Sequence, residues 1–249
     1  MSTEQYVRRL VKQSQHLMNV GRVEQAVSVL RLAVAATKDI DRQTEGANLL
    51  PRIYHRIAQV EVMRDNLYAA KKMFVKSEEA FDPNNVIGRS RVLRDHGLVV
   101  WEHDDTTEGK KLVEAALGAL RRPTETSPRW ELEYLVTEGF LARLAVDEDP
   151  AKALQVFLRV DARIRGCTKW MYELDNLEQI IPLLPRSKRP PYILRASMLA
   201  SRMVVADEIT HVSNLLLEDG KIVVAPFGCV VRTSLRLPGA AFTRARAMF

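Results

Sequence analysis

Apolar residues cover most of the circumference of the helix predicted over residues 21–36, "GRVEQAVSVLRLAVAA". A surface helix of a soluble protein normally has one apolar stripe and one polar face, whereas polar side chains are scarce here after Gln25. Such a helix is stable in water only when neighbouring elements cover it on two sides. The pattern therefore predicts a packed array of helices.

The same spacing recurs along the first two thirds of the chain. Each copy predicts a first helix, a short turn, and a second helix with a small residue followed one turn later by a large one. A small residue lets two crossing backbones approach closely, and a large one fills the seam to the next helix pair. The turn positions are Gly21, Asp65, Asp104 and Glu148. The small residues are Ala26, Ala70, Gly109 and Ala153, and the large ones are Leu30, Phe74, Val113 and Phe157.

This pattern resembles the tetratricopeptide repeat (TPR), in which antiparallel helical hairpins stack into a superhelix. The resemblance extends over about residues 5–165 and implies a mainly α fold, a right-handed superhelix of three to four hairpins. Successive small residues are 44, 39 and 44 positions apart, longer than the family period of about 34 residues. A divergent solenoid of other helical hairpins and an ordinary helical bundle remain alternatives.

The C-terminal quarter has a different pattern. The segment "PRSKRPPYILR", residues 185–195, contains three prolines and four cations, which predicts a boundary between a repeat domain over 1–185 and a basic module over 186–249. We expect helices near 192–204 and 206–218, then two strands, "KIVVA" and "CVVRTSL", and a flexible tail. This small α/β module resembles a winged helix, whose second helix can enter a DNA major groove.

The net charge of +6 lies entirely in residues 186–249, because the first 185 residues hold 27 basic and 27 acidic side chains. Clustered cations of this kind can contact nucleic-acid phosphates. However, the predicted second helix, "ADEITHVSNLLLEDG", has four acids and no Lys or Arg, which favours a role in assembly, as in proteasome lid and signalosome scaffolds. The basic patch comprises Arg186, Lys188, Arg189, Arg195, Lys221, Arg232 and Arg236.

The TPR resemblance places the first helix of each hairpin along a concave groove. Arginine forks there favour carboxylates or phosphates, and an exposed Trp can anchor an apolar side chain. Ordinary solvated helix faces are the alternative. The carboxylate clamp of chaperone-binding TPR domains is not matched, because it requires Lys and Asn where this chain has Val11, Gln15 and Arg56. The predicted groove residues are Arg8, Gln15, Met18, Arg52, His55, Gln59, Arg91, Arg94, Leu98 and Trp101.

Signatures of enzymes and metal sites are missing from the sequence. It contains no Gly-rich phosphate loop, no GxSxG and no HExxH, and its two cysteines lack metal-site spacing. The stretch "WEHDDTTEG", residues 101–109, is interpreted as a solvated turn, not a cation site. The remaining histidines, His16, His55, His96 and His211, have no evident carboxylate partner in the sequence. We expect no cofactor and no metal.

These features predict a non-enzymatic scaffold or adaptor that binds a protein partner, with an acidic segment as the expected ligand. It is expected to be a subunit of a larger complex or a homo-oligomer. The alternative is a nucleic-acid-binding regulator that uses the basic module, with the repeats as a sensor or dimerisation domain. No apolar run is long enough for a bilayer and no signal-peptide core is present at the N-terminus, so we expect a cytoplasmic or nuclear protein without membrane contact.

Overall fold

The computed structural model describes residues 2–19, 21–39, 48–121, 127–165, 170–205, 212–218 and 221–226, with only the backbone at residues 19, 39, 170 and 171 and from residue 200 onward. The chain divides into two compact units, one over residues 1–119 and the other from residue 120 onward. The boundary predicted after Pro185 falls inside the second of these units. The two units are described in turn.

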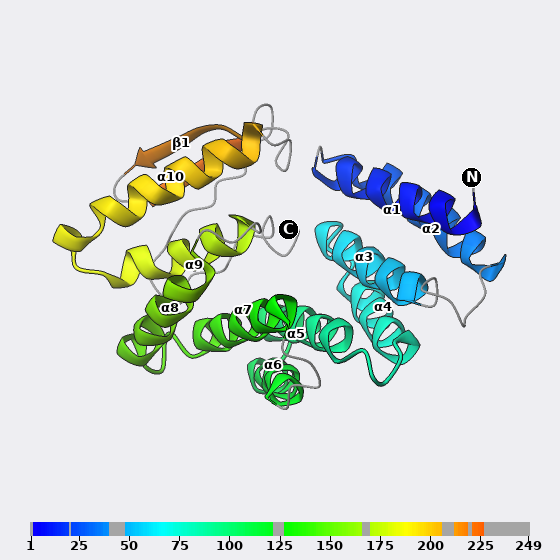
Figure 1. Cartoon of the computed structure of the whole chain (residues 1–249), viewed down its shortest axis with the longest axis horizontal. Coiled ribbons are helices and arrows are strands. Elements are labelled where there is room, and N and C mark those ends of the chain that lie inside the picture. The colour runs from blue at the N-terminus through cyan, green and yellow to red at the C-terminus, as the bar shows by residue number, and fades with distance from the viewer. Residues whose placement is uncertain are drawn as a thin grey trace. The chain divides into compact units, whose positions relative to one another are not determined.

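Unit 1 consists of helical hairpins (Figure 1). Helices α1 and α2 pack together, as do α3 and α4, while α2 also contacts α3 and α4 contacts α5. A short 3-10 helix, η1 (Thr37–Asp39), follows α2. Its α-helices among the described residues are α1 (Thr3–Asn19), α2 (Val23–Ala36), α3 (Leu49–Met63), α4 (Leu67–Ala80), α5 (Val86–His103) and α6 (Thr106–Leu120).

The turns of the first two hairpins share one backbone geometry. Gly21 and Asp65 have φ angles of 73° and 61°, in the left-handed region that Gly adopts freely and Asp tolerates better than most residues. The amide of Gly21 donates to Met18, and that of Asp65 donates in the same way to Val62. This is the usual way for a helix to end before an abrupt reversal, and it confirms the turn positions predicted from the repeat.

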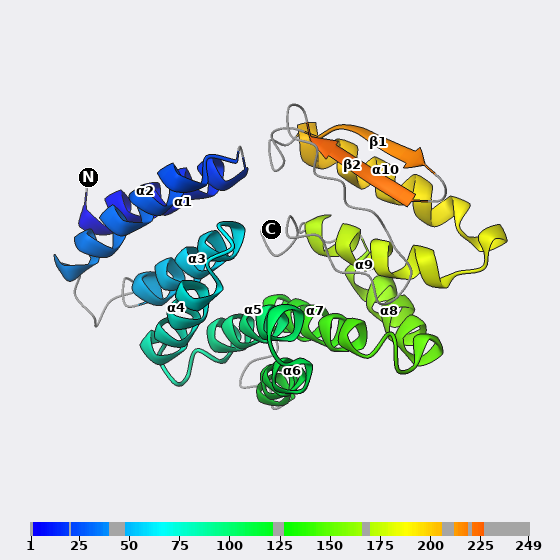
Figure 2. The ribbon, with the colours of Figure 1, turned by 180° about the vertical axis from the view of Figure 1, so that it is seen from behind.

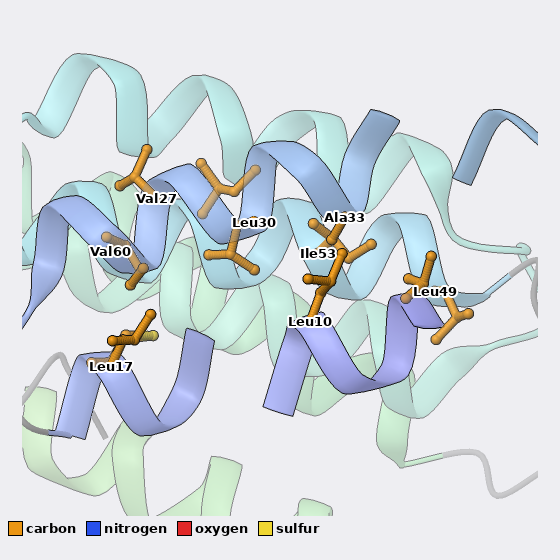
Figure 3. Packing of buried hydrophobic residues seen from close by; sticks show 12 residues of the cluster. Leu10, Leu17, Val27, Leu30, Ala33, Leu49, Ile53 and Val60 are labelled. Carbon is orange, nitrogen blue, oxygen red and sulfur yellow. The ribbon is translucent and has the colours of Figure 1, made fainter. Parts of the chain in front are cut away.

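A hydrophobic core cluster of unit 1 lies between α1, α2 and α3 (Figure 3). Leu30 of α2 and Ile53 of α3 are fully buried, and Leu10 and Leu17 of α1 pack into the same cluster. The expectation that neighbours cover α2 on two sides is therefore confirmed. It is wrong for one position, because the Leu32 side chain is 56% exposed.

The backbones of helices α5 and α6 approach each other closely at two glycines. A Cβ atom on Gly97 would lie 2.7 Å from the carbonyl oxygen of Gly109, and a Cβ on Gly109 would lie 2.4 Å from the amide nitrogen of Trp101. Both distances are too short for any side chain. The predicted small residue at the helix crossing is thus required by contact with backbone atoms.

Unit 2 continues the helical hairpins. Ser127 and Asp149 cap α7 and α8, through hydrogen bonds from the amides of Trp130 (3.2 Å) and Lys152 (2.9 Å), and each helix begins with a proline. Helix α8 packs against α7 and α9, and α9 packs against α10. The elements are α7 (Pro128–Leu144), α8 (Pro150–Ile164), α9 (Trp170–Leu183), η3 (Arg186–Lys188), α10 (Pro190–Val205), β1 (Val212–Glu218) and β2 (Lys221–Pro226).

Two antiparallel strands follow α10, and Figure 2 shows them beside that helix. Glu218 pairs with Lys221, and the register continues to Val212 and Pro226 with one irregularity near Asn214. Strand β2 covers the predicted "KIVVA" segment. Strand β1 lies over residues 212–218, within the helix predicted over 206–218, so the winged-helix interpretation of that segment is not supported. Residues 206–211 and the predicted strand "CVVRTSL" lie outside the described residues.

Within the part of the chain that the structure describes, no helix has both the length and the apolar character needed to cross a membrane.

Candidate partner-binding site

The predicted groove residues lie on α1, α3 and α5, and α3 contacts both of the other helices. Several of these predictions need correction, beginning with two apolar residues. Met18 and Leu98 are only 3% and 6% exposed, and Met18 packs into the core shared by α1, α2 and α3. Both apolar side chains are buried inside the protein, so they are not exposed contact residues.

Asp95 is the centre of a polar network between α3 and α5. Its Oδ1 accepts hydrogen bonds from Nε and Nη2 of Arg94, at 2.9 and 2.8 Å. Its Oδ2 lies 2.8 Å from Nε2 of His55 and accepts a 3.3 Å hydrogen bond from Nε2 of Gln59. Because a carboxylate can only accept, Nε2 of His55 carries the proton of this bond. Both carboxylate oxygens are therefore used within the protein.

Arg94 is only 3% exposed, which corrects its predicted role. Its guanidinium lies against the Asp95 carboxylate. It therefore positions neighbouring side chains and does not project toward a partner. His55 and Gln59 are also buried, at 8% exposure each. These three predicted groove residues thus lie together, but they are buried and form the floor beneath the surrounding exposed side chains.

Three arginines lie around this floor, and we call them the arginine surface: Arg52 and Arg56 on α3, and Arg91 on α5. Arg56 donates a 2.8 Å hydrogen bond from Nη1 to Oε1 of Gln59, which joins it to the network. Arg52 lies one helical turn before Arg56, and Arg91 lies one turn before Asp95. Arg52 is exposed, and Arg56 and Arg91 are half-buried.

Burial and nearby charges shift the pKa values of His55 and Asp95. Burial lowers the pKa of His55, and the charges of Arg56 and Arg91 lower it further, although Asp95 acts in the opposite direction. Burial alone would raise the pKa of Asp95, but Arg94 and His55 outweigh burial and hold it well below its usual value. At neutral pH the network therefore contains a neutral imidazole, a carboxylate and the Arg94 guanidinium.

The His55–Asp95 pair orients side chains between α3 and α5. The His55 ring also contacts Phe74, at 5.9 Å between ring centroids. The arginine surface offers fork-shaped donors that match carboxylate or phosphate oxygens.

Sequence reasoning missed Asp95 and Arg56. It noted no carboxylate partner for His55, yet that partner lies 40 residues further along the chain. A signal was available, because Arg91, Arg94, Asp95 and Leu98 share one face of a helix at spacings of three and four. Periodicity alone does not reveal that this face contacts α3, because that contact depends on the tertiary structure.

Three further predicted groove residues, Arg8, Gln15 and Trp101, lie on α1 and α5. Arg8 is exposed and pairs with Glu4 at 2.6 Å, one turn earlier on α1. Gln15 and Trp101 are half-buried. The structure therefore places some predicted groove residues together and leaves Arg8 in a local ion pair.

The stretch over residues 101–109 contains the end of α5, the turn at Asp104 and Asp105, and the start of α6. Asp105 accepts hydrogen bonds from the amides of Thr107 (2.8 Å) and Glu108 (3.0 Å), so it caps α6, and Asp104 is paired with Lys71. Among the described residues, no group of His, Cys, Asp and Glu is arranged to hold a metal ion.

The basic patch predicted for the C-terminal quarter separates into different environments. Arg189 donates to the carbonyl oxygens of Leu184 (2.8 Å) and Pro182 (3.0 Å), so it caps the C-terminal end of α9. Arg195 forms ion pairs with two buried acids. Arg186 and Lys188 are exposed on η3, and Lys221 begins β2. Arg232 and Arg236 lie outside the described residues.

No protein-family model and no curated protein sequence matches this chain. Among solved structures, it is similar to nearly identical TPR-like repeats from Podosopora anserina, from a protein provisionally assigned as a kinesin light chain. The TM-score is 0.52 at 12% identity, over 82% of this chain and 99% of the other. A single-substitution variant of that protein gives the same TM-score and identity, over 84% of this chain and 99% of the other. The mainly helical, TPR-like fold expected from the repeat pattern is thus confirmed.

Proposed function

We propose that this chain is a non-enzymatic protein-interaction scaffold whose arginine surface binds an acidic segment of a protein partner. The fold supports this proposal, because TPR-like repeats commonly bind protein partners. Stacked hairpins offer a long, rigid surface without a need for a deep catalytic cleft. Membership of a larger complex is part of the same proposal.

The observation that carries the proposal is that both carboxylate oxygens of Asp95 accept hydrogen bonds from within the protein. Asp95 is the acid of this network, and its two oxygens already accept hydrogen bonds from Arg94, His55 and Gln59. Arg94 therefore lies against Asp95, while Arg56 and Arg91 are close enough to lower the pKa of His55. Guanidinium groups on such a surface can bind a partner carboxylate through paired hydrogen bonds.

The test is a charge reversal on exposed and half-buried positions. We would compare the full wild-type chain with the double variant Arg52→Glu/Arg91→Glu in an affinity pulldown from native lysate, after circular dichroism has verified folding. The matched control is Arg31→Glu/Arg129→Glu, which reverses two exposed arginines on α2 and α7. The proposal expects the first variant to lose a partner that the control retains, and a synthetic acidic peptide from that partner to compete.

Equal recovery by the two double variants would contradict the proposal. A nuclease-treated sample addresses the nucleic-acid alternative, which predicts a partner lost with nuclease and an affinity that falls steeply with salt. Arg189 and Arg195 of the basic patch are engaged within the fold, and this favours the protein partner.

A further inference from the structure

Helix α10 of unit 2 has an exposed apolar face opposite its buried side. The side chains of Leu194 and Met198, one helical turn apart, are 64% and 50% exposed. Ala196 and Leu199, on the other side of the helix, are buried, and α10 packs against α9. Pro191 is exposed one turn before Leu194, on the same side. We call Pro191, Leu194 and Met198 the outer face of α10.

The stacking of the hairpins makes this apolar face unusual. The second helix of a hairpin contacts the first helix of the next where α2 meets α3, α4 meets α5 and α8 meets α9. Helix α10 is the last helix in the part of the chain that the structure describes. Strand β1 contacts it and lies beside it (Figure 2), yet Leu194 and Met198 stay exposed. A terminal element of a repeat array normally has a polar outer face, so an apolar one indicates that a further element packs here.

Positive charge borders the outer face of α10. Residues 179–206 contain five cations and no acid. Arg189 and Arg195 are engaged within the fold, but Arg186 and Lys188 are exposed on η3, directly before α10. Within the described part of the chain, the side chains of these two residues have no ion pair or hydrogen bond. Their charges are therefore available to an acidic partner.

The same charges argue against an occupant from the chain itself. A second copy that packed its own α10 here would bring the same cations together, and like charges across an interface are unfavourable. Residues 229–249 carry four arginines and no acid, so they would be repelled as well. The occupant must therefore supply acidic groups as well as apolar ones.

We propose that the outer face of α10 binds an amphipathic helix of a protein partner. Apolar side chains of that helix, three and four residues apart, contact Leu194 and Met198, and acidic side chains at one end face Arg186 and Lys188. A helix matches this surface because side chains four residues apart form a ridge that packs between the ridges of another helix. The unbranched side chain of methionine adapts to its neighbours. The partner helix would cover α10 as α9 covers α8.

This surface goes beyond the function proposed for unit 1, because it lies on another unit and depends on apolar contact. An anionic membrane shares the preference for cations, but its binding strength scales with the apolar area that is buried. Two large apolar side chains on one helical turn suit a single helix better than a lipid surface. Loss of both side chains is expected to weaken binding about tenfold or more.

The experiment measures the binding of a fluorescent peptide to the full chain by anisotropy. The probe is Glu-Glu-Glu-Ala-Leu-Gln-Ala-Leu-Leu-Gln-Ala-Leu-Gln-Ala, which as a helix has acids at one end and leucines along one face. One control peptide keeps the glutamates first but scrambles the remaining residues so that no apolar face forms. The other has glutamine in place of every glutamate. The expected result is that the probe binds and that both control peptides bind more weakly.

Variants of the outer face of α10 locate the site. Leu194→Gln/Met198→Gln should weaken binding of the probe about tenfold or more. Its matched control is Leu32→Gln/Val75→Gln, which removes two apolar side chains of unit 1 that are 56% and 43% exposed and should bind like wild type. Circular dichroism verifies that each variant folds.

Charge variants separate this surface from the arginine surface of unit 1. Arg186→Glu/Lys188→Glu should weaken binding of the probe but not of its glutamine form, whereas Arg52→Glu/Arg91→Glu should leave binding of the probe unchanged. If Arg52→Glu/Arg91→Glu loses the probe while the outer-face variant retains it, the peptide lies on the arginine surface and the present proposal is wrong.

Other outcomes would also overturn the proposal. They are a wild-type chain that does not bind the probe, equal binding of the probe and the scrambled peptide, and unchanged binding by Leu194→Gln/Met198→Gln. Sedimentation of the wild-type chain tests for a second copy, since a dimer that this variant dissociates would assign the face to self-association. Vesicles of phosphatidylcholine and phosphatidylserine that bind the wild type and not the variant would assign it to a membrane.

Discussion

Arg195 on α10 forms an ion pair with Asp161 on α8, whose side chain is only 2% exposed. Nε of the same guanidinium lies 3.2 Å from Oε1 of Glu173 on α9, which is equally buried. Arg165 also pairs with Asp161, at 2.9 Å. One side chain thus joins α8, α9 and α10, and it ties the helix that follows the proline-rich segment to the two before it.

We predict that Arg195→Ala strongly destabilises the protein. The substitution leaves two buried carboxylates with less compensating charge, and breaking a buried ion pair from one side costs about 3–5 kcal/mol. The expected loss is near the lower end of that range, because Arg165 still pairs with Asp161. Urea denaturation of the full chain, followed by circular dichroism, measures the change.

Arg159→Ala is the control for Arg195→Ala. Arg159 pairs with Glu138 at 2.8 Å, but its side chain is 58% exposed, and exposed pairs contribute about 0–1 kcal/mol. Similar denaturation midpoints for the two variants would show that the Arg195 cluster does not hold α10.

A second prediction concerns the crossing of α5 and α6. Gly97→Ala and Gly109→Ala each place a Cβ within 2.7 Å of a backbone atom, and backbone cannot move aside as a flexible side chain can. Overpacking of this kind costs about 1–3 kcal/mol. Thermal unfolding should show both variants melting at lower temperature than wild type.

Gly118→Ala tests whether that loss arises from crowding. Gly118 lies in the same helix, α6, with nothing near its Cβ position, and alanine is a better helix former by about 1 kcal/mol. This control should melt at the same temperature as wild type or higher. A lower melting temperature for Gly118→Ala than for Gly109→Ala would contradict the explanation.

The helical hairpins could be predicted from the sequence because their signals are local. The small residues at Ala26, Ala70, Gly109 and Ala153 and the turn residues Gly21 and Asp65 follow directly from spacing and backbone preference. Each of the four small residues is buried in the structure. The pairing of α9 with α10 was missed, because the prolines and cations of residues 185–195 resemble a linker. Arg189 and Arg195, counted there as surface charge, in fact hold these helices.

The strand over residues 212–218 shows why the C-terminal quarter was harder to predict. "SNLLLE" is a short apolar run, which periodicity cannot assign to helix or strand. The better signal was the Asp-Gly pair at 219–220 between two apolar runs, a dipeptide typical of tight hairpins. The candidate site was less predictable still, since the contact of His55 with Asp95 depends on how α3 meets α5.

A third prediction concerns pH. The pKa of His55 lies below 6.5 in the folded protein, mainly because of burial, so the unfolded chain binds a proton more readily. Stability is therefore fully present above about pH 7.5 and is lost as the pH falls through 6.5 toward the folded pKa. We expect the free energy of unfolding to decrease between about pH 7.5 and 5.5, and to decrease less in His55→Gln.

His96 contributes in the same direction, because burial and the charge of Lys71 lower its pKa as well. The double variant His55→Gln/His96→Gln should show the flattest profile over this range. Unfolding free energies at a series of pH values, measured by urea denaturation, test the prediction. A profile for His55→Gln that runs parallel to wild type would show that His55 is not a neutral buried group.

The last prediction concerns Asp95 as the residue that positions the arginine surface. Asp95→Asn keeps the shape but replaces one acceptor oxygen with an N–H donor, which would face the donors of Arg94 or those of His55 and Gln59. It also removes the carboxylate beside Arg94, a guanidinium only 3% exposed. We expect a loss of about 3 kcal/mol, measured by urea denaturation at neutral pH.

Asp105→Asn provides the comparison for Asp95→Asn, because it makes the same chemical change at an exposed helix cap. Asparagine caps helices about as well as aspartate, so this variant should unfold close to wild type. The low pKa of Asp95 adds a second readout: its contribution to wild-type stability should be lost as the pH falls below about 3.8, so acid should reduce the gap between wild type and Asp95→Asn. If the two asparagine variants unfold at the same urea concentration, Asp95 does not organise this surface. The arginines would then owe their positions to their own helices.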